Sequence, residues 1–180
     1  MTYQAEVAGW HDFYILAGTG SATLVGLLFV GLSLHLQIVI SASEVRSLAR
    51  VTLANFGAVL FVALFMVIPQ GASAAGSQLI GAGIVSLIVA GPSLVGAVRS
   101  REWSFEMSLM QRLRVALRFG LSSLSYLAII VAGILLLASS SAAFTVLVTT
   151  IVVLLVVSLR NTWDLLVTVA DVTQDNGESD

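Results

Sequence analysis

The chain has 180 residues, of which 58% are hydrophobic and only 10% are charged, and its mean hydropathy is +1.01. A water-soluble domain of this length carries far more charge on its surface, so the composition indicates one compact membrane domain. The net charge of -2 and the lack of a basic face outside the membrane edges argue against nucleic acid as a partner. The absence of cysteine excludes disulfides and thiol chemistry.

Residues 13–36 form the first apolar run, which carries no formal charge and would reach over about 30 Å as a helix. No Lys or Arg precedes the run, and it is longer than the apolar core of a signal peptide, so we expect a retained span. Small residues recur along it at three- and four-residue steps and would share one helical face: Gly18, Ser21, Ala22, Gly26 and Ser33. Such a face is either a seam for another membrane helix or the lining of a pore.

Residues 51–98 contain no charged side chain and are long enough for two spans. Pro69 and Gly71 interrupt the run, which predicts a turn over residues 69–78 between spans at about 50–68 and 79–98. Asn55 falls inside the second span, where its amide needs a partner on a neighbouring helix. Pro92 falls inside the third span and should kink it.

Residues 99–118 form a basic segment with five of the eight basic residues of the chain, all of them arginine. Its apolar residues repeat every three to four positions, which predicts a helix in or near the lipid headgroup layer that contacts anionic lipid or a partner. An ordinary cytoplasmic loop whose arginines set the topology is the alternative. The candidate contact residues are Arg99, Arg101, Trp103, Arg112, Arg114 and Arg118.

Residues 119–159 again lack charge and suit two spans, at about 119–138 and 143–159, with a turn at the serines of 139–141. Tyr126 lies inside the fourth span, where its hydroxyl should find a hydrogen-bond partner. Arg160 and Asp164 are four residues apart after the fifth span and are candidates for a polar contact at the membrane edge. We therefore expect a single transmembrane domain over residues 1–172. Residues 173–180 are expected to form a disordered acidic tail.

Five spans place every arginine on one side of the membrane and none on the other. Arginine-rich short loops face the cytoplasm. We therefore expect an all-α membrane protein, a bundle of five transmembrane helices in the cytoplasmic (inner) membrane of a bacterium, with the N-terminus outside and the C-terminus in the cytoplasm.

The sequence contains no pattern that predicts catalysis, a metal site or a cofactor. It has no His-Glu-x-x-His motif, no phosphate-binding loop and no Gly-x-Ser-x-Gly motif. No span carries a charge near its midpoint, which argues against a proton relay or charge-coupled transport. We therefore expect a protein that is not an enzyme and has no cofactor.

The Trp-His-Asp-Phe-Tyr run that begins at Trp10, the Gly/Ala-rich first span and the Arg-Asn-Thr-Trp-Asp run at residues 160–164 resemble a family of small actinobacterial membrane proteins. The residues that carry the likeness are Trp10, Asp12, Gly26, Gly31 and Asn161 to Trp163. Some members of this family are labelled modulators of the FtsH protease. The resemblance implies a membrane partner and supplies no catalytic residues.

Two functions remain open on the sequence. The first is an interaction or regulatory subunit in the membrane, bound to another membrane protein and to anionic lipids. The alternative is a small homo-oligomeric channel or transporter in which the Gly/Ser/Thr face of the first span lines the path.

Overall fold

The computed structural model describes residues 3–34, 36, 40, 43–103 and 109–177; the side chains of residues 43–44, 93–103, 109–119 and 168–177 lie outside that description. Within these residues the fold is all-helical, with five helices long and apolar enough to span a membrane, which confirms the predicted class and number of spans. The helices are α1 (Tyr3–Leu34), α3 (Ser43–Val67), α4 (Ala72–Trp103), α5 (Leu109–Leu137) and α6 (Ala142–Gly177).

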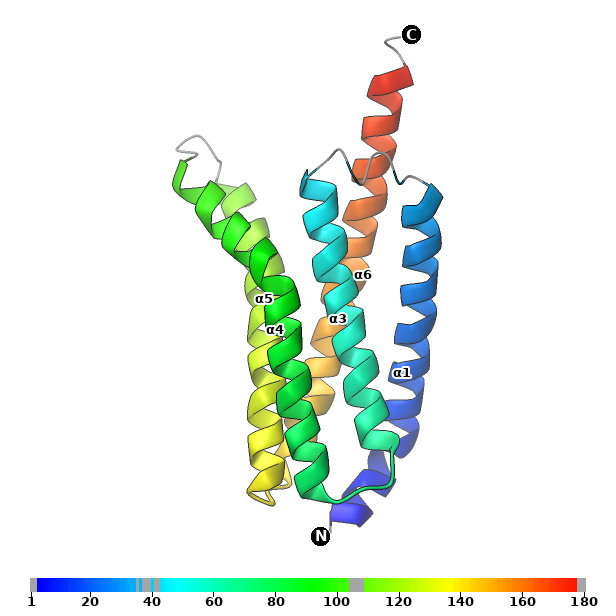
Figure 1. Ribbon diagram of the computed structural model, residues 1–180, viewed down its shortest axis with the longest axis vertical. Coiled ribbons are helices and arrows are strands. Elements are labelled where there is room, and N and C mark those ends of the chain that lie inside the picture. The colour runs from blue at the N-terminus through cyan, green and yellow to red at the C-terminus, as the bar shows by residue number, and fades with distance from the viewer. Residues whose placement is uncertain (1–2, 35, 37–39, 41–42, 104–108, 178–180) are drawn as a thin grey trace.

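The helices run alternately up and down, and four of them form a ring (Figure 1). Each of α3, α4, α5 and α6 packs on its two neighbours in that cyclic order. α1 lies outside the ring, mainly against α3, so most of its surface is exposed. The N-terminus and the C-terminus therefore lie at opposite ends of the bundle (Figure 1).

The core lies inside the ring and beneath α1. Its largest fully buried side chains include Phe56, Met66, Leu79, Ile129 and Leu147. Close packing of these side chains fills the half of the bundle nearer the N-terminus. A smaller cluster joins α1, α3 and α6 towards the other end: Leu28, Val45, Leu48, Ala49 and Leu165.

Short turns join the helices at the end of the bundle near the N-terminus. α3 ends at Val67, and α4 begins at Ala72, earlier than the predicted start at residue 79, because only Pro69 and its neighbours interrupt the helices. After α5, Ser139 adopts a left-handed conformation with φ of 56°, while Ser139 N and Ser140 N donate to the carbonyls of Leu136 and Leu135. This pair of bonds is the Schellman arrangement that ends a helix, and it forms the turn predicted from the serines.

All five helices are longer than the apolar spans that predicted them. α1 begins at Tyr3 rather than residue 13, because Tyr3 and Val7 pack against the core and hold the first turns in place. α6 continues to Gly177 and takes in residues assigned to an acidic tail, because no proline or glycine precedes Gly177 in the helix.

α4 contains Pro92 and runs on to Trp103, and its last turns lean away from the bundle (Figure 1). A proline inside a helix removes one backbone hydrogen bond and favours such a bend. The described residues of the basic segment, 99–103 and 109–118, belong to two helices. Its first residues end α4, residues 104–108 lie outside the described part, and the remainder begins α5.

Candidate functional site

A hydrogen-bonded cluster of buried polar side chains crosses the ring from α3 to α5. The Tyr126 hydroxyl donates to Asn55 Oδ1 at 2.6 Å, and Asn55 Nδ2 donates to Ser122 Oγ at 3.1 Å. All three residues are fully buried. The structure thus brings together two residues that the sequence singled out and adds Ser122, which the sequence analysis missed although it lies one helical turn before Tyr126.

Two further buried polar groups lie on α6. Ser158 Oγ and Asn161 Nδ2 have no hydrogen-bond partner among the described residues, and both side chains are almost fully buried. Neither side chain was predicted from the sequence to form a site. Their spacing of three residues, inside an apolar helix, is the signal that could have found them, because it places both on one face.

The inner face of α1 is a close seam against α3. Ser21 is buried and its hydroxyl donates to the carbonyl oxygen of Phe56 at 2.6 Å. At Gly18, an added Cβ would lie 3.0 Å from the Cβ of Ala63. Small side chains at these two positions let the two helices approach each other closely, as they do at many membrane helix interfaces.

The remaining predicted residues of the α1 face point elsewhere. Ala22, Gly26 and Ser33 are exposed, and an added Cβ at Gly26 would meet no atom within 4 Å. Because successive residues in a helix are rotated by about 100°, the line through Ala22 and Gly26 lies beside the line that carries Ser21, not on it. The structure therefore divides the predicted face into an inner seam and an outer surface.

A second and tighter seam joins α4 to α5, and the sequence analysis missed it. An added Cβ would lie 2.8 Å from the Gly133 carbonyl oxygen at Gly76, and 2.7 Å from the Gly76 carbonyl oxygen at Gly133. At Gly83 it would lie 2.5 Å from Ile130 Cγ1. Gly76 and Gly83 are seven residues apart, which is two helical turns on one face and the signal that could have found this seam.

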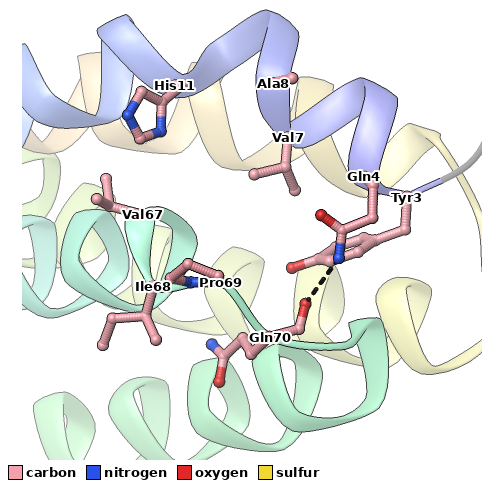
Figure 2. Close-up of a pocket in the computed structure, with 9 residues that line it drawn as sticks. All are labelled: Tyr3, Gln4, Val7, Ala8, His11, Val67, Ile68, Pro69 and Gln70. Carbon is pink, nitrogen blue, oxygen red and sulfur yellow. Dashed lines mark hydrogen bonds between the residues drawn. The ribbon is translucent and has the colours of Figure 1, made fainter.

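A pocket of about 300 Å³ lies between the first turns of α1 and the turn that joins α3 to α4 (Figure 2). Gln4 Nε2 donates to the Gln70 carbonyl oxygen across it at 3.5 Å, and Gln70 Nε2 donates to the Phe65 carbonyl oxygen and to Gln78 Oε1. His11 lines the pocket on the α1 side (Figure 2). The Gln4 bond joins the α3–α4 turn to α1, and the two bonds of the Gln70 side chain hold this turn against α3 and α4.

The structure describes the side chains of only some of the charged residues that were predicted to make contacts. The side chains of the basic segment, Arg99, Arg101, Trp103, Arg112, Arg114 and Arg118, lie outside the described residues. Arg160 is exposed and Asp164 is partly buried, on successive turns of α6. The contacts proposed for the basic segment with lipid or a partner stay predictions.

The chemistry of the described interior is that of neutral hydrogen-bonding groups. Its buried polar side chains are hydroxyls and amides of Ser, Thr, Asn and Tyr. In the part of the chain that the structure describes, no group of three or more His, Cys, Asp or Glu residues is placed to hold a metal ion. Such an interior can join helices and bind small polar molecules.

Comparison with known proteins gives no relative: no family model, no curated protein and no solved structure matches the chain. What the fold defines is an all-helical protein with five helices that suit a membrane.

Proposed function

We propose that the protein is a multi-pass subunit of the bacterial cytoplasmic membrane that binds a transmembrane helix of another membrane protein on the outer surface of α1. The observation that carries this proposal is the exposure of Ala22, Gly26 and Ser33 on a helix whose neighbouring inner side packs on α3. We call these three residues the outer α1 surface. Small residues spaced by about one turn let a second helix approach closely in lipid, where no water drives helices together.

The interior of the ring supports an interaction role over transport through a single chain. Val59, Met66, Ile129, Leu147 and Leu154 are fully buried inside it and contact one another as one core cluster. Apolar side chains packed in this way leave no room for a hydrated path along the bundle axis. The alternative function, a channel assembled from several copies, would use the same outer α1 surface as its lining.

The orientation of the bundle follows from its arginines. Arg46 and Arg50 lie in the first turns of α3, and the five arginines of the basic segment lie where α4 ends and α5 begins, at the end of the bundle opposite the N-terminus (Figure 1). Because arginine-rich ends face the cytoplasm, we propose that the N-terminus is outside and the C-terminus inside. Anionic lipids of the inner leaflet would then contact this basic end.

The proposed docking is tested by Gly26→Leu, which adds a large side chain where the free chain has open space. We expect this variant to fold as the wild type does and to lose its partner. Binding is measured by cross-linking in native membranes followed by native mass spectrometry from lipid nanodiscs. Gly81→Leu is the matched control, because Gly81 is also an exposed helical glycine with no atom near an added Cβ, but lies on α4.

The two functions predict different complexes. A partner chain of different mass, lost in Gly26→Leu and kept in Gly81→Leu, supports the subunit. A closed ring of identical copies, with solute flux that Gly26→Leu blocks, would establish the channel instead. Unchanged complexes in both variants contradict any use of the outer α1 surface.

A further inference from the structure

Apart from Thr150, the buried polar side chains of the four ring helices lie in the middle part of the bundle. At about 1.5 Å per residue, they lie about 16–29 Å from the helix ends at the N-terminal side. We call this set the polar layer: Thr52, Asn55, Ser86, Ser122, Ser125, Tyr126, Ser158 and Asn161. The Asn55 bonds to Ser122 and Tyr126 confirm that residues placed at similar heights by this count do meet.

The hydrogen bonds within the polar layer divide it into satisfied and unsatisfied groups. Asn55 and Tyr126 bond within the cluster already described, and the hydroxyls of Thr52 and Ser125 donate to the carbonyl oxygens of Leu48 and Leu121 in their own helices. Ser158 Oγ and Asn161 Nδ2 bond to no described residue. A buried polar group without a partner costs about 1–3 kcal/mol, so two on adjacent turns require an explanation.

Ser158 and Asn161 face the interior between α6 and α3. Leu165, one turn beyond Asn161 on the same face, packs on Val45, Leu48 and Ala49 of α3. Leu154, one turn before Ser158, belongs to the main core. The two polar groups are therefore enclosed above and below by apolar packing, and any molecule that they bind is small.

We propose that Ser158 Oγ and Asn161 Nδ2 bind one small hydrogen-bond acceptor inside the membrane domain, either a water molecule or a monatomic anion such as chloride. The amide nitrogen of Asn161 can only donate hydrogen bonds, and the Ser158 hydroxyl can also donate. Donors on adjacent turns suit an acceptor and do not suit a metal cation. This site lies inside the ring and is independent of the proposed docking on α1.

Substitution of the two donor residues should change the thermal midpoint in opposite directions, depending on whether a molecule is bound between them. If the two groups are unsatisfied, Ser158→Ala and Asn161→Leu should leave the thermal midpoint unchanged or raise it, because an unpaired buried polar group is lost. If they bind a molecule, each variant should lower the midpoint by about 3–6 °C, because favourable bonds are lost. Thr150→Val is the matched control, since Thr150 lies buried on α6 with its hydroxyl already bonded to the Val146 carbonyl oxygen.

A second measurement observes the bound molecule directly, so a loss of packing alone cannot imitate the result. Solid-state NMR of the protein in lipid, with nitrogen-15 in asparagine, reports magnetisation transfer from water to the Asn161 side chain. The same spectra are recorded in chloride and in gluconate at equal ionic strength. A difference in the Asn161 signal between the two salts reports a bound halide.

The outcomes separate the two sources and can overturn the site. Transfer from water without a chloride effect identifies water. A chloride-dependent shift of the Asn161 signal, with a midpoint that rises with chloride in the wild type and not in Asn161→Leu, identifies the anion. Variants that are no less stable than the control, or an Asn161 side chain that responds to neither water nor chloride, would overturn the proposal.

Discussion

Two buried tyrosines differ in what their hydroxyls contact. The Tyr126 hydroxyl donates to Asn55, whereas the Tyr14 hydroxyl is buried on α1 without a partner among the described residues. We expect Tyr126→Phe to lower the free energy of unfolding by about 1 kcal/mol, because it leaves Asn55 Oδ1 without its donor. Tyr14→Phe should leave stability unchanged or raise it, since no bond is lost.

The two phenylalanine variants are compared by denaturant titration in mixed micelles. They share the same chemical change and the same degree of burial, so each is the control for the other. Equal effects of the two variants would mean that the Asn55 bond adds nothing to stability.

At the scale of single residues, the sequence predicted which side chains need a partner but not which partner they have. An amide at position 55 inside an apolar span has to be satisfied, whatever the fold. That Ser122 and Tyr126 satisfy it depends on the rotation of α5 about its axis, which packing decides. Ser158 was not predicted to matter, and Asn161 entered only through the family resemblance, because serine and asparagine near the end of a predicted span are usually solvated.

The contact between α4 and α5 depends on two glycines that face each other. We expect Gly133→Ala to lower the free energy of unfolding by about 1–3 kcal/mol, because its Cβ would lie 2.7 Å from a backbone oxygen and the helices would have to separate. Gly81→Ala on α4 is the control, since an added Cβ there meets no atom within 4 Å. Thermal unfolding in nanodiscs measures both.

The expected order is a clear loss of stability for Gly133→Ala and no loss for Gly81→Ala. A Gly133→Ala variant as stable as the control would show that α4 and α5 do not approach as closely as the two glycines allow.

At the scale of helices, apolar runs predicted the existence of every span and placed the ends less well. The ends of α1 and α6 lie beyond the apolar residues because helix hydrogen bonds continue until a residue or a contact stops them. Hydropathy identifies only the part of each helix that is apolar enough to lie in lipid. The sequence likewise predicted one small-residue face on α1 where the structure has an inner and an outer side. A small residue is compatible with both a helix contact and an exposed position. Ser21 and Ala22 differ only because α3 packs against the side that carries Ser21.

The alternating direction of the helices predicts which loops share a side of the membrane. The chain has no cysteine, so a single introduced cysteine can be labelled without interference. We expect Ser141→Cys, in the turn between α5 and α6, to react with a membrane-impermeant maleimide in intact cells. Asn176→Cys, near the end of α6, should react only after the membrane is permeabilised.

The opposite labelling pattern would reverse the proposed orientation while leaving the fold intact. Labelling of both sites in intact cells would instead show that α6, the helix between the two cysteines, does not cross the membrane.

For the whole molecule, the number of spans and the up-and-down order could be predicted, but the arrangement of the helices could not. Length and charge decide how often the chain crosses a membrane, and both are visible in the sequence. That α3 to α6 close a ring while α1 lies outside depends on matching surfaces, such as the α4–α5 glycines and the Ser21 contact, whose partners lie far apart in the chain.

The ring has one further consequence, for the order of assembly in the living cell. α6 is synthesised after α3, α4 and α5, and its contacts with α5 and α3 close the ring. Until it inserts, the nascent chain holds α3, α4 and α5 as an open row, with the side of α3 that α6 will cover still facing lipid. A chain that stalls before α6 therefore leaves Val45, Leu48 and Ala49 of α3 without their contact with Leu165, so this part of the core stays incomplete until α6 inserts.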